Sequence, residues 1–268
     1  MTRLTGADVT DPGDRLARLD HQLHEIAGLG LRELALEAAG GAPGVVPFAG
    51  RRVAAVPVTT GLGLIGGFST MVAAVLDSIG CDAVVTGGTD VAGIHEAVLG
   101  GARALFLADD TTFIAFDVES GRCADNDTAT AAGYVAALAA AADGLAGRPV
   151  FLLGLGPVGR AAARFLLARG ALVLVAEPDY RRREAALAAL PTLRPVSLAE
   201  GLAAGDLIFD ATPAPGIIGA GDIRVSTIAA VPGIPSGFTA EAQAALGSRH
   251  IHDPLAIGVA TMAAMALR

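Results

Sequence analysis

The chain has no lysine and no tryptophan, and all 19 basic residues among its 268 are arginine. Without a lysine amine no Schiff base can form, which excludes pyridoxal-phosphate chemistry and the lysine base expected of many amino-acid dehydrogenases. Aromatic residues are also scarce, at 4% against 53% hydrophobic residues. The core must therefore be built from Ala, Val, Leu and Ile, which suits parallel strands covered by helices rich in small residues.

Cysteine and positive charge are scarce as well. Cys81 and Cys123 match no metal-binding spacing and no CxxC motif, so we expect no metal site and two idle thiols in a reducing cytoplasm. With a net charge of −8, the chain lacks the excess positive charge that binding to nucleic acid or to an anionic membrane would need. The N-terminus carries acids and a proline where a signal peptide needs an apolar core. We expect a soluble, cytoplasmic protein.

One uncharged stretch is long enough to span a bilayer. Residues 53–76 contain no charge over 24 positions, but they include Pro57 and four glycines. This composition predicts a strand, a glycine-rich turn and a buried helix rather than a membrane span.

Short apolar runs alternate with helical patterns along most of the chain. Strands are predicted at residues 53–58, 82–85, 102–107, 150–153, 171–176, 206–211, 226–230 and 250–252. Such alternation predicts an α/β fold with parallel sheets and right-handed crossovers. We expect two domains: an N-terminal α/β substrate domain with a short parallel sheet over residues 1–145, and a C-terminal Rossmann dinucleotide-binding domain over residues 146–268.

The pattern GxGxxG occurs twice, at residues 61–66 and 154–159, each time after a predicted strand. A dinucleotide site also needs an acid about 20 residues on, to accept hydrogen bonds from the adenosine ribose. Glu177 stands 21 residues after Gly156, whereas the strand after the first copy ends without an acid. We therefore assign NAD to the second copy, with Glu177 opposing the extra phosphate of NADP. The residues of this turn are Gly154, Leu155, Gly156, Pro157, Val158 and Gly159.

Alternatives to this assignment remain open. The second copy could be an ordinary strand–helix turn, or part of a methyltransferase site for S-adenosylmethionine. Arg181, Arg182 and Arg183 lie just downstream of Glu177 and weaken the case against NADP. The first glycine turn could bind a substrate carboxylate at a helix N-terminus, or could serve packing alone. Asp109 and Asp110, at the end of a predicted strand, could contact a ligand or cap the turn.

Several segments, taken in order, resemble the pyrrolysine biosynthesis dehydrogenase family PylD. They are Leu4-Thr5-Gly6-Ala7-Asp8, Val56-Pro57-Val58-Thr59-Thr60-Gly61, Gly67-Phe68-Ser69, Asp90-Val91-Ala92-Gly93, Ala108-Asp109-Asp110-Thr111-Thr112-Phe113, Gly154-Leu155-Gly156, Val231-Pro232-Gly233-Ile234-Pro235 and Pro254-Leu255-Ala256-Ile257-Gly258. The resemblance implies NAD-dependent oxidation of the terminal primary amine of L-lysine-Nε-3-methyl-D-ornithine. The oxidised product then closes to pyrrolysine with loss of ammonia.

The resemblance also implies roles for individual residues. Asp109 would face the reacting or neighbouring amine as the catalytic residue. The substrate would be bound by Leu4, Thr60, Gly61, Gly63, Phe68, Asp109 and Asp253. The nicotinamide half of the cofactor would be lined by Ala211, Thr212, Pro213, Val231, Pro232 and Gly233. Thr60, Glu177 and Asp253 depart from the Ser, Asp and Glu expected in the family, and each keeps the chemical type. His95, His250 and His252 have no expected counterpart and receive no chemistry.

Two other functions stay open from the residues alone. One is an NAD-dependent imine or amino-acid dehydrogenase for a smaller substrate. The other is a non-catalytic NAD-binding redox sensor, for which an acidic chain without a DNA-binding helix pair is a poor candidate. We expect a small-molecule substrate and no nucleic-acid or membrane partner, and the oligomeric state, with a homodimer as one option, is left open.

Overall fold

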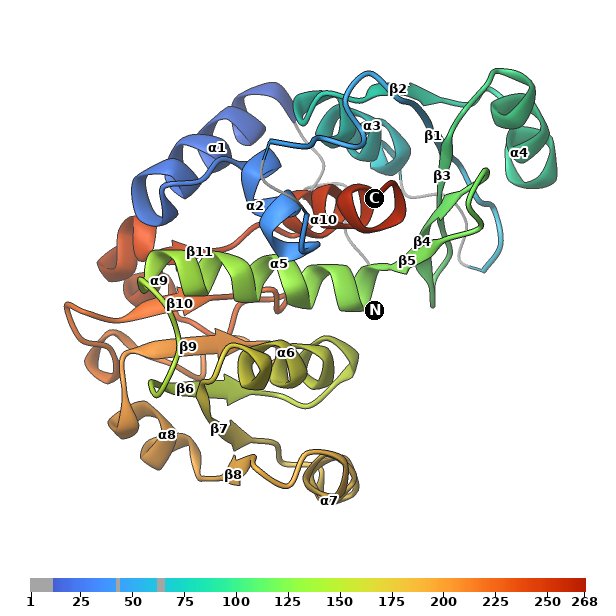
Figure 1. Ribbon diagram of the computed structural model, residues 1–268. Helices are drawn as coiled ribbons and strands as arrows, with labels where there is room; N and C mark the ends of the chain where they lie inside the picture. The colour runs from blue at the N-terminus through green and yellow to red at the C-terminus, as the bar shows by residue number, and fades with distance from the viewer. Residues whose placement is uncertain (1–11, 42–43, 62–65) are drawn as a thin grey trace. The chain divides into compact units, whose positions relative to one another are not determined.

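The computed structural model describes residues 12–41, 44–61 and 66–268. These residues form two compact units, coloured along the chain in Figure 1. Unit 1 comprises Gly30–Gly133, Leu255–Arg268 and the segment that ends at His21, and unit 2 comprises Gln22–Leu29 and Tyr134–Pro254. Two helices, α1 (Pro12–Ala27) and α5 (Asn126–Ala141), contribute residues to both units.

Unit 1 is built on a mixed five-stranded sheet of order β2-β1-β3-β4-β5. The strands β1, β2 and β3 are parallel, as the strand–helix alternation predicts, and a hairpin adds β4 and β5 antiparallel to them. The elements, in chain order, are α2 (Leu31–Ala38), β1 (Arg52–Val56), α3 (Phe68–Ser78), β2 (Asp82–Val85), α4 (Asp90–Leu99), β3 (Ala104–Ala108), β4 (Phe113–Asp117), β5 (Cys123–Asp125) and α10 (Ala256–Ala266).

The C-terminal helix α10 belongs to unit 1, which differs from the expected domain of residues 146–268. Ten of its eleven residues are buried, and a helix that is apolar all round needs neighbours on every side. Among its contacts are α2, α3, β4 and β5. At two glycines the packing is so close that a Cβ atom would collide with a neighbouring side chain: Gly133 faces Ile257 and Thr261, and Gly258 faces Thr130. The expected boundary after residue 145 is also displaced, because the longer segment of unit 2 begins within α5 at Tyr134 and a short one, Gln22–Leu29, precedes it.

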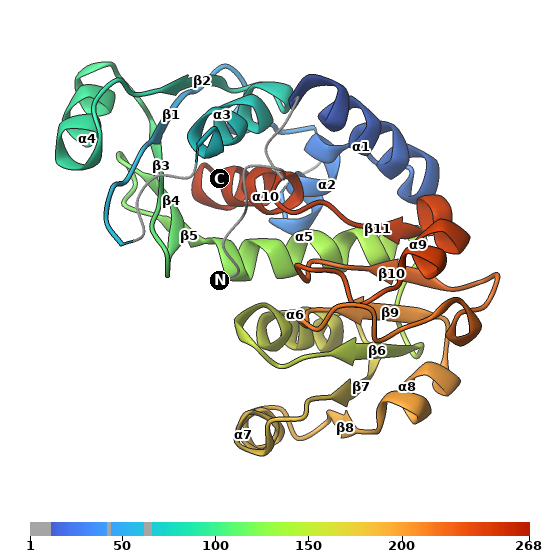
Figure 2. The same cartoon turned by 180° about the vertical axis from the view of Figure 1, so that it is seen from behind.

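Unit 2 contains a six-stranded sheet in which every pairing is parallel. Figures 1 and 2 show its strands one above another in the order β11-β10-β9-β6-β7-β8. The elements are β6 (Pro149–Leu153), α6 (Pro157–Ala168), β7 (Leu172–Ala176), α7 (Tyr180–Ala189), β8 (Arg194–Pro195), α8 (Leu198–Ala204), β9 (Leu207–Asp210), β10 (Ile228–Ala230), α9 (Ala240–Leu246) and β11 (His250–Ile251), with short 3₁₀ turns η2 (Ala220–Asp222) and η3 (Gly247–Arg249).

This order is that of a Rossmann fold and confirms the predicted fold class. The chain starts in the middle at β6, builds β7 and β8 to one side, then crosses to build β9, β10 and β11 on the other. In such sheets ligands bind outside the carboxyl ends of the strands, where the direction of winding reverses. That point lies between β6 and β9, so the loops after these strands and their neighbours are the ones to search.

Within the described ranges, no helix is long and apolar enough to cross a membrane. The same residues contain no group of three or more His, Cys, Asp or Glu side chains that could hold a metal ion.

Candidate active site

The turn between β6 and α6 has the form of a phosphate cradle. Gly154 adopts a positive φ of 84°, and a Cβ atom at Gly159 would collide with the Gly154 carbonyl, so only glycine lets the helix approach the strand this closely. At Gly156, in contrast, an added Cβ atom would meet nothing within 4 Å. Pro157 begins α6, where its missing N–H costs nothing. Gly159 thus packs tightly against Gly154, while the space beside the backbone of Gly156 is open. A pyrophosphate needs such open space to approach the N-terminus of a helix.

Glu177 lies directly beside this turn. It follows β7 and is 7% exposed. Its Oε2 atom accepts a hydrogen bond of 2.7 Å from the backbone N–H of Leu155, and its Oε1 atom accepts one of 2.9 Å from Asp179. The carboxylate therefore ties the glycine turn to the end of the next strand. This is the place from which an acid can reach the ribose of a nucleotide on the turn.

The two loops expected around the nicotinamide contact each other. Ala211, Thr212 and Pro213 follow β9, and Val231, Pro232 and Gly233 follow β10. The N–H of Gly233 donates to the carbonyl of Asp210 over 3.0 Å, and a Cβ atom at Gly233 would collide with the carbonyl of Thr212. Both loops leave the carboxyl edge of the sheet on the β9 side of the switch point. A Cβ atom at Gly154 would lie only 3.0 Å from the carbonyl oxygen of Ala211, so the glycine turn and the loop after β9 are also neighbours.

Asp210 is a buried acid that the sequence reasoning missed. It is fully buried at the end of β9, where its carboxylate accepts hydrogen bonds from the N–H groups of Gly237, at 2.8 Å, and Thr212, at 3.1 Å. Burial raises the pKa of Asp210 to about 6 although both hydrogen bonds oppose the rise. An acid that ends an otherwise apolar strand and precedes Ala211-Thr212-Pro213 was the available sequence signal.

Two histidines that were given no chemistry from the sequence lie at β11, with their ring centroids 5.5 Å apart. His252 is half-buried just after β11, with its Nδ1 atom 2.6 Å from the carbonyl oxygen of Val231. His250 lies within β11, and burial, aided by the charge of His252, lowers its pKa to about 4. The imidazole of His250 is therefore uncharged at neutral pH.

In unit 1, Asp109 sits at the start of the tight turn between β3 and β4. Its Oδ1 atom accepts hydrogen bonds from the N–H groups of Thr111 and Thr112, both at 2.7 Å, and from the Thr111 hydroxyl at 2.9 Å. The backbone and side-chain hydrogen bonds of Thr111, followed by that of Thr112, lower the pKa of Asp109. The side chain is exposed. Asp109 therefore both caps the turn and presents a permanent negative charge to solvent.

The described part of the first glycine turn adjoins this hairpin. Gly61 has a positive φ of 81°, and a Cβ atom there would collide with the carboxylate of Asp110. Phe68, at the start of α3, packs edge-to-face on Phe113 with ring centroids 5.4 Å apart. Unit 1 thus brings Gly61, Phe68 and the Asp109 turn together at the carboxyl edge of its parallel strands.

The other expected substrate residues are distributed differently. Thr60 is exposed in the loop after β1, where its neighbour Thr59 donates two hydrogen bonds to Asp90, at 2.9 and 2.6 Å. Asp253 is buried in unit 2, and its backbone is held on both sides by the Tyr134 hydroxyl. Leu4 and Gly63 lie outside the described residues.

Comparison with known proteins identifies the family. The model of the pyrrolysine biosynthesis protein PylD, N-terminal domain, matches residues 8–124. Pyrrolysine synthase of Methanosarcina acetivorans is 31% identical over 264 residues, covering 98% of both chains. The chain belongs to the PylD family. Pyrrolysine synthase of Methanosarcina barkeri is also 31% identical, over 98% of this chain and 97% of its own. The prediction of the family is confirmed.

Solved structures resemble the chain more distantly. An Ael1 enzyme from Pseudomonas putida is 17% identical, with a TM-score of 0.49, over 80% of this chain and 90% of that one. Quinate dehydrogenase from Corynebacterium glutamicum in complex with NAD is 16% identical, with a TM-score of 0.46, over 67% and 79%. Likenesses at this level do not bear on the reaction.

Proposed function

We propose that the protein oxidises the terminal primary amine of L-lysine-Nε-3-methyl-D-ornithine with NAD and yields pyrrolysine and ammonia. The observation that carries this proposal is the 31% identity, over 98% of both chains, to a protein named pyrrolysine synthase. The match spans the phosphate cradle of unit 2 and the Asp109 hairpin of unit 1 alike. A shared fold alone would not support a particular reaction.

The residues of unit 2 fit NAD. The bare backbone at Gly156 and the N–H groups that open α6 suit the pyrophosphate. Glu177 suits the hydroxyls of the adenosine ribose, and the contacting loops after β9 and β10 suit the nicotinamide half. NAD, when bound, supplies the acceptor for the hydride that leaves the substrate.

Asp109 is suited to holding a cation. A hydride leaves readily only from a carbon that carries a neutral amine, because the nitrogen lone pair stabilises the developing iminium ion. Since its hydrogen bonds lower the pKa of Asp109, this carboxylate stabilises an ammonium or iminium charge rather than taking a proton from it. A water molecule against Asp109 then accepts the proton.

Ring closure follows from the substrate itself. Loss of one proton and then of one hydride converts the terminal CH₂–NH₃⁺ group into the iminium group CH=NH₂⁺. The α-amine of the ornithine part attacks that carbon and forms a five-membered ring, and the original amine leaves as ammonia. Because attacking and attacked groups belong to one molecule, this step needs little further catalysis.

The test uses the purified protein, the isopeptide and NAD, and follows NADH, ammonia and product mass together. We expect all three in equal amounts, with a mass equal to that of pyrrolysine. Lysine and ornithine, given separately, serve as control substrates and should be poor. NADH without ammonia would exclude ring closure by this route. Better turnover of a free amino acid than of the isopeptide would favour the smaller-substrate dehydrogenase.

A further inference from the structure

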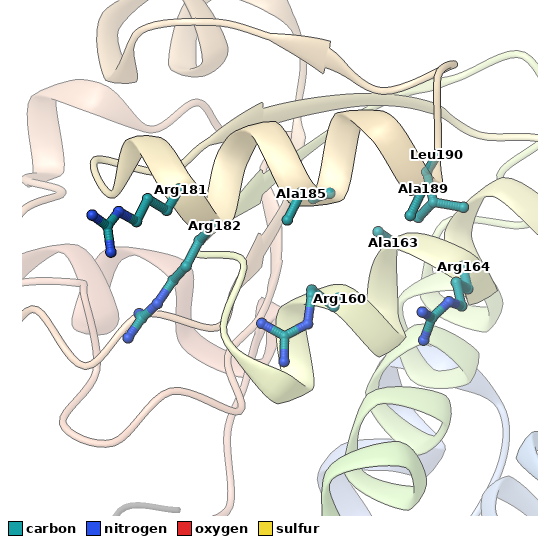
Figure 3. A pocket seen from close by; sticks show the side chains of 9 residues that line it. Arg160, Ala163, Arg164, Arg181, Arg182, Ala185, Ala189 and Leu190 are labelled. Atoms are coloured by element: carbon teal, nitrogen blue, oxygen red, sulfur yellow. The ribbon is translucent and has the colours of Figure 1, made fainter.

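A pocket of about 260 Å³ lies between α6 and α7 in unit 2. Figure 3 shows Arg160 and Arg164 on α6, and Arg181 and Arg182 on the first turn of α7. Its lining consists of Arg160, Arg164, Arg181, Arg182, Ala163, Ala185, Ala186, Ala189 and Leu190. Four arginines thus line the pocket together with alanines and one leucine, and no acid is among the lining residues. Positive charge is thus gathered at this pocket in a chain whose net charge is −8.

The charges of these arginines are largely uncompensated. Arg160 donates to a neutral acceptor, the carbonyl of Leu155, over 3.0 Å. Arg182 lies 3.7 Å from a carboxylate oxygen of Asp179, but the other oxygen of that carboxylate caps α7. Within the described part of the chain, the side chains of Arg164 and Arg181 form no ion pair. Like charges gathered without partners cost stability, and a bound anion would remove that cost.

The pocket is connected to the proposed ribose acceptor through two short paths. Arg160 binds the carbonyl of Leu155, whose N–H donates to Glu177. Arg182 adjoins Asp179, whose N–H donates to the other oxygen of Glu177. The arginines of the pocket therefore neighbour the two residues whose N–H groups hold the Glu177 carboxylate.

We infer that this pocket receives the 2′-phosphate of NADP, so that the protein binds NADP as well as NAD. The phosphate is a dianion with three acceptor oxygens, which matches guanidinium groups that donate in pairs. The alanines of the lining leave space that larger side chains would fill. The inference rests on the proposed nucleotide site at Gly156 and Glu177. Glu177 still disfavours the added charge, so NAD binds more tightly, while the arginines keep NADP binding measurable.

Calorimetry without substrate tests this directly, with NAD, NADP, 2′-AMP and 5′-AMP as ligands. Arg181→Gln and Arg182→Gln each remove one charge from the pocket and leave the glycine turn intact. The matched control is Arg194→Gln, an exposed arginine of the same unit outside the pocket. We expect each pocket variant to weaken NADP and 2′-AMP about tenfold, the value of one charge-assisted hydrogen bond, and to leave NAD unchanged. Added salt should weaken NADP more steeply than NAD.

The outcomes separate this inference from the proposed function. NAD binding without NADP binding would overturn the inference and leave the function standing. Equal binding of 2′-AMP and 5′-AMP, or equal losses in all three variants, would also overturn it, because the pocket would then show no selectivity for the 2′ position. Failure of both NAD and NADP to bind would refute the nucleotide site itself, and with it the proposed function.

Discussion

Substitution of Gly156 by valine separates cofactor binding from folding. The backbone there has φ −63° and ψ −173°, a conformation open to any residue and the one favoured before a proline. No atom lies within 4 Å of a Cβ atom built at this position. Valine is a poorer N-terminal cap than glycine, so the expected loss of folding stability is about 1 kcal/mol. The fold should survive.

Cofactor binding should not survive. The branched side chain would occupy the space that the pyrophosphate needs to reach the backbone N–H groups at the start of α6. Two hydrogen bonds to a charged group, at about 1.5 kcal/mol each or more, amount to about 3 kcal/mol, or roughly a hundredfold in dissociation constant. Gly156→Ala, with one methyl group, should give a smaller loss.

The assay pairs NAD titration by calorimetry with thermal unfolding. Gly159→Ala is the contrasting variant, because its Cβ atom would collide with the Gly154 carbonyl. It should lower the melting temperature clearly, whereas Gly156→Val should lower it little. Normal NAD binding by folded Gly156→Val would refute the assignment of the pyrophosphate to this turn.

Three further variants test single residues. Burial raises the pKa of Asp210 from 3.8 to about 6, so the folded state binds the proton more tightly and stability falls as pH rises from about 4 to 6, by roughly 3 kcal/mol at most. In Asp210→Asn the free energy of unfolding, measured with urea, should no longer fall between about pH 4 and 6. An unchanged slope would show that another group causes the pH dependence. Tyr134→Phe removes the hydroxyl that binds the backbone N–H and C=O of Asp253, so the free energy of unfolding, measured by thermal unfolding, should fall by about 1–3 kcal/mol; a change within error would mean that other partners replace the hydroxyl. Asp109→Asn keeps an oxygen that can accept the hydrogen bonds of the turn but removes the negative charge. The value of kcat/KM for the isopeptide should therefore fall about tenfold, while the affinity for NAD stays unchanged. Full activity of this variant would show that Asp109 has no role in the reaction.

The geometry of the second glycine turn and of Glu177 was predictable because its signals are local. Gly154 and Gly159 are required by a turn only six residues long, Gly156 leaves its backbone bare, and Glu177 follows from the length of one helix and one strand. Such features depend on backbone geometry and short spacing, which a sequence shows directly. The alternation of strands and helices likewise determined the parallel pairing of β6, β7 and β9.

Features that depend on distant partners were not predictable in this way. The apolar pattern of α10 shows that it is buried but not against which sheet, and its partners lie more than a hundred residues earlier. Two-residue strands such as β8 and β11 exist only because a longer neighbour pairs with them. The burial of Asp210 depends on Gly237, which lies 27 residues away in sequence. In each case the decisive contact is tertiary.

Two carboxylates at strand ends illustrate how environment assigns roles, and together they predict the pH dependence of the reaction. Asp109 is exposed and its pKa is lowered, so it stays charged and is a weak base. Asp210 has a pKa of about 6, but it is fully buried and both of its oxygens bind backbone N–H groups. Asp109 is too weak a base, and Asp210 too deeply buried, to take a proton from an amine.

If water is the acceptor, the neutral amine must arise from the substrate's own ionisation, near a pKa of about 10.4 for a lysine-like amine. The value of kcat/KM should therefore rise with unit slope from neutral pH toward that value, with no bend near pH 6. The measurement is the initial rate of NADH formation at subsaturating isopeptide over pH 6–10, in the wild-type protein and in Asp210→Asn. A plateau beginning near neutral pH would show that an enzyme group is the base, and its loss in His252→Gln would identify that group as the histidine at the end of β11.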